Sequence, residues 1–285
     1  MQEMLDQIID VAAKVRATVP LVHNITNYVT VNDVANAELA IGGSALMADD
    51  IDEVRDMVSI ARCTNVNMGT LDARTIESMV EAVKVANELG VASVFDPVGA
   101  GASQLRNQTA RRLLAQTEPT VVRGNLSEVS FVAGLGASTK GVDSSDADAG
   151  NDPVAVASGI ARERGCVVAI TGAVDVITDG TTVVKIANGL PMMGKITGTG
   201  CMCDGVIGCF VGALDDLSNS RDVVAATAGA ICSVGLSAER AYARLQERDG
   251  QVGTGSLHIG IIDELSLLDE AAYREGAHVE CLELA

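Results

Sequence analysis

The 285-residue chain has no tryptophan, and only 2% of its residues are aromatic. Its core therefore has to be built from Val, Ile, Leu, Ala and Met, and a hydrophobic fraction of 48% is ample for a large one. Linkers are missing as well, because no charge run, Pro-rich stretch or Ser-rich stretch divides the chain. We therefore expect residues 1–285 to form a single domain.

Positive charge is scarce, with 20 Lys and Arg against 38 Asp and Glu and a net charge of −18. A nucleic-acid partner needs clustered Lys and Arg to neutralise its phosphates, so this balance argues against one. Only five of the basic residues are Lys. A dispersed acidic surface with few Lys suggests a protein that is soluble at high salt, where screening removes self-repulsion. Adaptation to high salt is therefore a hypothesis about habitat.

Long apolar runs are missing too, since none reaches about 18 residues without Gly or a polar residue. The acidic N-terminus lacks the basic and apolar regions of a signal peptide. The seven cysteines do not pair in number or spacing, and the close pair Cys201 and Cys203 has no His-rich partner nearby, so a zinc site is not expected. Cys203, Cys209 and Cys232 are interpreted as buried small hydrophobes. Together these features predict a cytoplasmic protein without a membrane partner.

Apolar strand-like runs alternate with amphipathic helical segments through most of the chain. This pattern predicts an α/β fold with a mainly parallel central sheet and helices on both faces. Asp179-Gly180 predicts a hairpin turn, Gly90 a helix C-cap, residues 23–27 a polar turn and residues 136–152 a loop. Helices are expected at 4–16, 31–40, 51–62, 72–89, 103–116, 125–133, 153–164 and from 203 onward, and strands at 45–47, 65–68, 91–95, 120–122, 167–170, 174–178 and 181–186.

Several glycine-rich or polar loops follow directly after expected strands. Ligands bind outside the carboxyl ends of the strands in parallel sheets, so these loops would gather at one edge of the sheet and form a site there. The loops contain Gly69, the run DPVGAG from Asp96, Arg123-Gly124-Asn125, and Thr171-Gly172.

The stretch ITGTGC, residues 196–201, has the composition of a loop that leads into a helix N-terminus. Such a terminus binds anions through its unpaired backbone N–H groups and the helix dipole, and glycine lets a phosphate approach closely. Cys201 would lie where a thiolate is stabilised. The same residues also occur in ordinary turns, so the stretch alone does not decide between the two interpretations.

Three further segments each have two interpretations from the residues alone. Asp96 is either a magnesium-linked or phosphate-orienting acid, or the start of an Asp-Pro turn. Asn125 and Glu128 have the spacing of a helix capping box, and the same pair could order water around a metal that bridges phosphates. Arg123 either clamps a phosphate or pairs with a surface acid.

Two segments nearer the N-terminus are equally open. His23 with Asn24 and Asn27 could line a polar pocket, although a lone histidine is more often a hydrogen-bonded structural residue. Met47 could form a soft apolar wall for a small ring, or it could belong to the core.

Taken together, the segments resemble the hydroxyethylthiazole kinase family of the ribokinase-like superfamily. The cysteine that follows GTG separates this family from relatives that carry Asp there. The matching segments run in order over residues 20 to about 210: PLVHNITNYVTVNDVAN from Pro20, GGS from Gly42, MADD from Met47, NMGTL from Asn67, DPVGAG from Asp96, RGN from Arg123, TG from Thr171 through Asp175 to Asp179-Gly180, and TGTGC from Thr197.

The resemblance implies a ribokinase-like fold and transfer of the γ-phosphate of ATP, with Mg²⁺, to the alcohol of 4-methyl-5-(2-hydroxyethyl)thiazole in thiamine biosynthesis and salvage. It also implies a homotrimer whose sites lie between subunits, so that Asn24, Asn27 and Met47 would serve a neighbour's site. By the same resemblance Met47, Gly198, Asn24, Asn27 and Gly69 bind the thiazole substrate, Arg123, Thr171 and Asn125 bind ATP, Asp96 and Glu128 lie near the metal, and Gly198, Thr199, Gly200 and Cys201 are catalytic.

The expected mechanism is phosphoryl transfer, which needs positioning and charge neutralisation more than covalent catalysis. Backbone N–H groups of residues 198–201 would form the anion hole. Cys201 would lie near the attacking hydroxyl and could accept its proton if the helix terminus lowers its pKa. The chain departs from the family at Ala45, where Pro is common, and at Cys203-Asp204, where apolar residues are commoner. Asp204 would either lower the affinity for ATP or face solvent.

Three other functions remain open at this point. A nucleotide-dependent dehydratase that repairs hydrated nicotinamide cofactors shares the anion hole but carries Asp after GTG, as do kinases for other heterocyclic alcohols. A non-catalytic nucleotide sensor would be favoured by loss of the acids or the anion-hole residues, yet Asp96, Glu128 and residues 198–201 are present.

Overall fold

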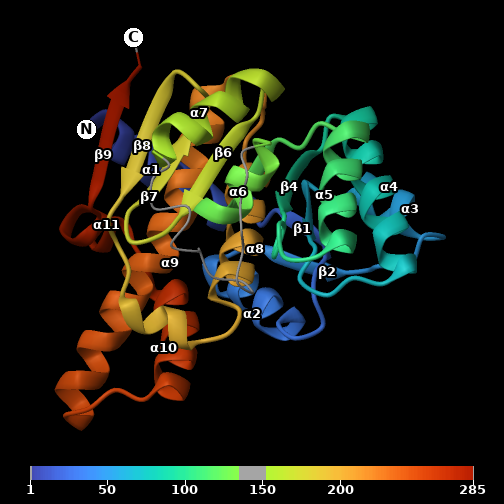
Figure 1. The fold of residues 1–285 in the computed structure, drawn as a ribbon. Coiled ribbons are helices and arrows are strands. Elements are labelled where there is room, and N and C mark those ends of the chain that lie inside the picture. The colour runs from blue at the N-terminus through green and yellow to red at the C-terminus, as the bar shows by residue number, and fades with distance from the viewer. Residues whose placement is uncertain (1, 135–151, 285) are drawn as a thin grey trace.

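The structure is a computed structural model that describes residues 2–134 and 152–284, and these residues form one nine-stranded sheet (Figure 1). The strand order is β2-β1-β3-β4-β5-β6-β7-β8-β9, with parallel pairing from β2 through β6 and antiparallel pairing from β6 to β9. The strands are β1 (Leu21–Ile25), β2 (Ser44–Met47), β3 (Cys63–Asn67), β4 (Ala92–Asp96), β5 (Val121–Asn125), β6 (Val167–Thr171), β7 (Asp175–Thr178), β8 (Thr182–Ile186) and β9 (Val279–Glu283).

Helices cover both faces of the sheet, as the sequence pattern predicted. One face is covered by α1, α2, α8 and α9, with α10 packed on α2 and α9 and α11 packed on α1, and the other face is covered by α3 to α7. The helices are α1 (Gln2–Thr18), α2 (Val31–Ile41), α3 (Val54–Ile60), α4 (Ala73–Leu89), α5 (Gln104–Gln116), α6 (Leu126–Val132), α7 (Pro153–Arg164), α8 (Thr199–Gly212), α9 (Ser220–Asp249), α10 (Thr254–Leu267) and α11 (Glu270–Gly276), with a short 3-10 helix, η2, at Pro191–Lys195.

Successive strand residues supply two separate cores because side chains alternate across a strand. Val94 and Val121 belong to the core beneath α8 and α9, whereas their neighbours Phe95 and Val122 belong to the core beneath α3 to α7. The central strands are therefore buried on both sides. β4 and β6 read as mainly hydrophobic runs for this reason, whereas β3 is buried but carries Thr64, Asn65 and Asn67.

Two expectations about local structure were wrong, and two were confirmed. Residues 23–27 do not form a simple turn, because β1 continues through Ile25 and its polar side chains find buried partners. The chain is not helical throughout after residue 203, since β9 (Val279–Glu283) pairs with β8 at the sheet edge. The hairpin between β7 and β8 and the left-handed C-cap at Gly90 are as expected. The loop expected at 136–152 lies almost wholly outside the described residues.

Helix α9 is long and apolar enough to cross a membrane by length and composition, the one such helix in the described parts of the chain. Of its apolar window, 89% is buried inside the protein. It packs against α1, α8 and α10 and against strands β6 to β8. Its apolar length is therefore accounted for by packing in the core.

Glu38 is a fully buried acid on α2, beside the interface with α8. Asn24 Nδ2 donates to its Oε2 at 3.1 Å, and its Oε1 has no hydrogen-bond partner within the described residues. Burial raises the pKa of Glu38 well above its ordinary value, and the Asn24 hydrogen bond opposes this only partly. The folded state therefore favours the neutral acid.

Replacement of Glu38 by Gln tests this electrostatic cost. A raised folded pKa means that stability is complete below the unfolded pKa of about 4.3 and falls as pH rises toward the folded pKa, by up to about 1.4 kcal/mol per pH unit. Glu38→Gln mimics the neutral acid, so we expect it to flatten this decline and to match or exceed the parent protein at pH 7.5. Urea unfolding between pH 5 and 8 measures the effect. The exposed Glu247→Gln on α9 is the matched control and should leave the slope unchanged.

Candidate active site

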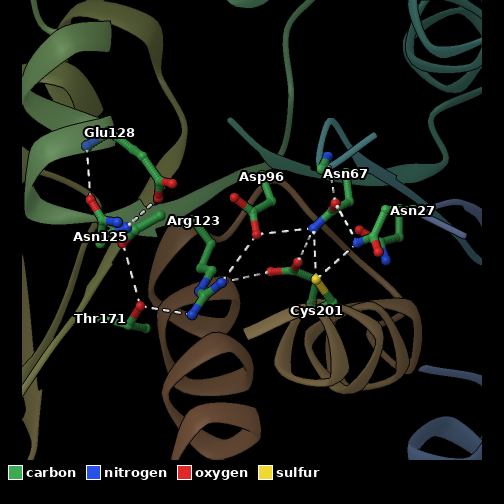
Figure 2. A network of polar contacts seen from close by, with 12 residues as sticks. Asn27, Asn67, Asp96, Arg123, Asn125, Glu128, Thr171 and Cys201 are labelled. Carbon is green, nitrogen blue, oxygen red and sulfur yellow. Dashed lines mark hydrogen bonds and ion pairs between the residues drawn. The ribbon is translucent and has the colours of Figure 1, made fainter. Parts of the chain in front are cut away.

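The carboxyl ends of β3, β4, β5 and β6 bring polar side chains together beside the start of α8 (Figure 2). Register places Asn67 opposite Asp96 and Asn125 opposite Thr171 at the last residues of paired strands. The loops after β3, β4 and β6 gather at one edge, as the parallel sheet requires, whereas Arg123, Gly124 and Asn125 are not a loop but the end of β5, which passes directly into α6. The anion-binding candidate, residues 198–201, lies at the same edge because α8 begins at Thr199.

Arg123 is the cation at the centre of this edge. Its Nη1 donates to Asp96 Oδ2 at 3.1 Å and lies 3.5 Å from Asp204 Oδ1, and its Nη2 donates to Thr171 Oγ1 at 2.7 Å. Arg123 is only 12% exposed, so its partners are not surface acids. Burial acts to lower the pKa of Arg123, but the two carboxyl groups outweigh it and the pKa is raised.

Asn67 and Asn27 surround the thiol of Cys201 (Figure 2). Asn27 Nδ2 lies 3.1 Å and Asn67 Nδ2 lies 3.4 Å from Cys201 Sγ, and both donate to it. Asn67 Oδ1 accepts from Asn27 Nδ2 and from the backbone N–H of Gly69. A Cβ at Gly69 would lie 2.8 Å from Asn27 Nδ2, so only glycine leaves room for this arrangement.

Asp204 does not face solvent, which corrects one of the two expectations for it. The side chain is completely buried on α8 and accepts from Asn67 Nδ2 at 2.9 Å. Burial raises the pKa values of both Asp96 and Asp204, and the charge of Asp204 raises that of Asp96 further. The carboxyl pair therefore holds a proton more readily than two exposed acids would.

The pKa of Cys201 is raised to about 11 rather than lowered. Burial is the largest cause, and the nearby carboxyl groups of Asp204 and Asp96 add to it. Hydrogen bonds from Thr30 and Asn27 favour the thiolate but are outweighed. The expectation of a stabilised thiolate at the helix N-terminus was therefore wrong, because it took no account of the burial of the sulfur or of the acids beside it, Asp204 on the same helix and Asp96 from β4.

Asn125 and Glu128 form the capping box of α6. Glu128 N–H donates to Asn125 Oδ1, and Glu128 Oε2 accepts from Asn125 N–H. The second oxygen, Oε1, accepts from Gly99 N–H at 2.7 Å and so ties the loop after β4 to β5. Burial, with a contribution from Asp96, raises the pKa of Glu128 to about 7.

A pocket of about 560 Å³ opens beside Arg123 and the first residues of α8. Its polar lining comes from β5, β6 and the start of α8, whereas its apolar lining comes from residues 190–193 and from α9. Two walls of different character suit a ligand with a charged part and an apolar part. The lining includes Arg123, Thr171, Asp175, Asn188, Thr199 and Gly200 together with Leu190, Pro191, Met193, Ile231 and Val234.

The expected site residues separate into two groups. Arg123, Thr171, Asp96, Cys201, Asn27 and Gly69 belong to one connected network, with Thr199 and Gly200 at the pocket. Gly198 has φ +88° and lies close to Thr30. Asn24 lies outside this network, since its side chain bonds Glu38, Asn65 and the backbone of Val22. His23 is a buried structural histidine bonded to Thr64 and Ala48, and Met47 is half-buried on the edge strand β2.

The role of Asn67 and the buried position of Asp204 are not among the features predicted from the sequence. Asn67 carried a usable signal, because it is the last residue of a buried strand, two residues before Gly69. Asp204 carried one as well, as a charged residue inside the otherwise apolar start of α8. Neither signal tells which residues lie opposite the side chain in the fold.

The residues at this edge could bind Mg²⁺ with only a small number of protein ligands. Asp96 Oδ1 is buried and has no hydrogen-bond partner in the described chain, so one carboxylate oxygen is available. No cluster of three or more Asp, Glu, His or Cys within residues 2–134 and 152–284 could hold a metal by itself. Mg²⁺ usually keeps several waters and binds one or two carboxylates together with substrate phosphates, which agrees with this donor set.

A family model for the hydroxyethylthiazole kinase family matches residues 12–271. The chain is 52% identical over 280 residues to hydroxyethylthiazole kinase of Ruminiclostridium cellulolyticum, covering 98% of this chain and 99% of that protein. It is 43% identical over 265 residues to hydroxyethylthiazole kinase of Methanocella arvoryzae, covering 92% and 94% of the two chains.

Solved structures agree with these sequence matches. The hydroxyethylthiazole kinase protein of Pyrococcus horikoshii superposes with a TM-score of 0.83 at 36% identity, over 97% of this chain and 99% of that chain. Pyridoxal kinase of Staphylococcus aureus in complex with ADP superposes with a TM-score of 0.60 at 16% identity, over 94% of this chain and all of that chain. The second likeness supports the ribokinase-like fold alone.

Alkylation of Cys201 tests the raised pKa of its thiol. Because the thiolate is the reactive form, we expect iodoacetamide labelling at Cys201 to accelerate by about tenfold per pH unit between pH 7 and pH 10, with no plateau. Peptide mass spectrometry after timed pulses measures the rate, and Cys201→Ser identifies the peptide. A plateau below pH 8 would contradict the electrostatic argument and restore a stabilised thiolate.

Proposed function

Since the chain belongs to the hydroxyethylthiazole kinase family, we propose that it transfers the γ-phosphate of ATP to the primary alcohol of 4-methyl-5-(2-hydroxyethyl)thiazole, a step of thiamine biosynthesis and salvage. One observation carries this proposal. Residues 198–201 separate the pocket beside Arg123 and Thr171 from the Asn27–Asn67–Cys201 group, so a donor and an acceptor can meet at the start of α8.

The pocket is the proposed nucleotide site. Arg123 and Thr171, together with the N-terminus of α8 at Thr199 and Gly200, face the phosphates, because cationic and N–H groups stabilise phosphate charge there. Residues 190–193 and α9 supply apolar surface for the base. Asn125 acts indirectly, since its capping box with Glu128 fixes the junction where β5 passes directly into α6.

The proposed chemistry depends on positioning and on fixed charge. Backbone N–H groups of Gly198, Thr199, Gly200 and Cys201 form the anion hole for the moving phosphoryl group. Asp96 and Glu128 lie on the side where Mg²⁺ would be held through water and phosphate oxygens, and the ion supplies charge neutralisation when bound. Asp96 has the available oxygen, whereas both oxygens of Glu128 already accept backbone N–H groups.

The proposed acceptor site lies on the other side of Cys201, among Asn27, Asn67 and Gly69. The thiol of Cys201, with a pKa of about 11, remains protonated at neutral pH and is a poor proton acceptor. We therefore assign Cys201 to shaping the acceptor site rather than to general base catalysis.

Met47 serves the thiazole ring of a neighbouring subunit in the proposed homotrimer. Two features support an interface there: β2, which carries Met47, is an edge strand, and Tyr28 and Val29 after β1 are 81% and 57% exposed. Apolar side chains with such exposure are typical of protein interfaces. We also propose a cytoplasmic location, because all seven cysteines are free thiols.

ADP release from Mg-ATP tests the reaction class. We expect release that depends on hydroxyethylthiazole, and formation of the phosphorylated alcohol by mass spectrometry. Assays at low and at molar potassium chloride also test the high-salt hypothesis, since an adapted acidic protein should be more active at molar salt. If hydroxyethylthiazole causes no release at either salt level, pyridoxal, a hydroxymethylpyrimidine and hydrated NADH are tried next, and consumption of any of them would contradict the proposed substrate.

Gly200→Ala tests the nucleotide side of the site. A Cβ at residue 200 would lie 2.8 Å from Arg123 Nη1, so the guanidinium has to move away from Asp96 while the backbone stays in place. We expect KM for ATP to rise by about tenfold and the melting temperature to fall, because the buried ion pair between Arg123 and Asp96 is weakened. Gly253→Ala, where a Cβ meets nothing within 4 Å, is the control. An unchanged KM for ATP would place the phosphates away from Arg123.

A further inference from the structure

Asp204 is a buried acid to which the resemblance assigns no role, yet it lies at the centre of the candidate site. Its side chain is completely buried, one turn into α8 from the proposed anion hole. An acid at such a place opposes the binding of phosphate by charge, and burying it is costly unless it is paired. The structure meets that cost with a cation and an amide, Arg123 and Asn67.

The two partners of Asp204 serve different halves of the site. Arg123 lies 3.5 Å from Asp204 Oδ1 and reaches Thr171 through its other terminal nitrogen. Asn67 donates to Asp204 Oδ2 at 2.9 Å and also reaches Cys201. Asp204 is therefore a link between the lining of the pocket and the group around Cys201.

Other contacts limit where these two partners can go. Asp96 Oδ2 accepts from both Arg123 Nη1 and Asn67 Nδ2, each at 3.1 Å, so the two acids hold the same pair of side chains from two elements, β4 and α8. Gly200 leaves the space that Arg123 occupies beside the anion-hole loop. With Asp204 removed, Asp96 still contacts both partners. Thr171 is then left as a contact of Arg123, and Asn27 and Gly69 as contacts of Asn67, so each partner is held by fewer contacts.

We propose that Asp204 is a positioning residue for phosphoryl transfer, holding Arg123 against Gly200 on the nucleotide side and Asn67 against Cys201 on the acceptor side. This inference rests on the proposed function. Asp204 acts through its two partners and does not itself touch either substrate. Through these two contacts its buried carboxylate aligns the nucleotide side of the site with the acceptor side.

Two substitutions separate the two contacts. In Asp204→Asn, the amide oxygen can still accept from Asn67, but the ion pair between Asp204 and Arg123 is lost with the charge. In Asp204→Ser, the short side chain reaches neither partner. A positioning role therefore predicts that Asp204→Asn weakens the binding of the nucleotide alone, whereas Asp204→Ser disturbs both the nucleotide side and the acceptor side.

Steady-state kinetics with each substrate varied measures this difference. We expect Asp204→Asn to raise KM for ATP by about tenfold while kcat and KM for the alcohol stay within about twofold. Asp204→Ser should add a fall in kcat of about 10-fold to 100-fold, because a small misplacement of groups around the acceptor is enough for such a loss. Asp56→Asn, which removes an exposed acid on α3, is the matched control and should behave as the parent protein.

A double-mutant cycle tests whether the effect passes through Arg123. If it does, Asp204→Asn should have little further effect on KM for ATP in an Arg123→Lys background, so the two losses will not add. Full additivity, or parent-like KM and kcat values in both Asp204 variants with unchanged melting temperatures, would overturn the proposal and leave Asp204 a structural residue.

A crystal structure of the Asp204→Asn variant tests, independently of activity, whether Asp204 positions Arg123 and Asn67. We expect Arg123 to lose its contact with Thr171 while Asn67 keeps its contact with Cys201. Retention of every contact would overturn the inference. If the parent protein shows no thiazole-dependent ADP release, the proposed function fails, and the positioning of Arg123 is then decided by this structure alone.

Discussion

The buried guanidinium of Arg123 is the group on which the candidate site depends. It lies between two carboxyl groups from different elements, Asp96 at the end of β4 and Asp204 on α8, and it reaches Thr171 at the end of β6. Because an unpaired charge in this place would be strongly destabilising, Arg123 has to stay in contact with its acidic partners. Asp96, Asp204 and Thr171 are therefore held in fixed positions relative to one another. The ends of three elements that are distant in sequence are thereby held in one arrangement beside Gly200.

The parallel sheet explains why such a group can form at all. Strands that run in the same direction end at the same edge, and the register places Asn67 beside Asp96 there. Helix α8 then crosses beneath this edge and contributes both the glycine-rich loop and Cys201. Glu128 adds a tie of its own, because its two oxygens join the loop after β4 to the start of α6. Hydrogen bonds within the protein thus tie these segments to one another.

Periodicity predicted most of the elements because burial on both faces leaves long apolar runs in the central strands and one apolar stripe on each helix. It failed at β1 and β9 for different reasons. The polar His23 and Asn24 concealed β1, since their partners Thr64 and Glu38 lie on other elements. The edge strand β9 is half exposed and pairs with β8 alone, so its sequence lacks the buried run by which the other strands were recognised.

The sequence by itself determined the α/β class, the glycine-rich start of α8, the capping box at Asn125 and the family, because these depend on residues close together along the chain or on motifs in order. Only the tertiary structure decided the protonation and contacts of the site. Burial, Asp204 one turn along the same helix, and Asp96 from β4 raise the pKa of Cys201 to about 11, against what its position at a helix N-terminus suggested. Asp204 is buried rather than exposed because its partners, Asn67 and Arg123, come from β3 and β5. Neither the burial of a side chain nor its pKa can be read from its neighbours along the chain, because both depend on the groups that lie nearby in space.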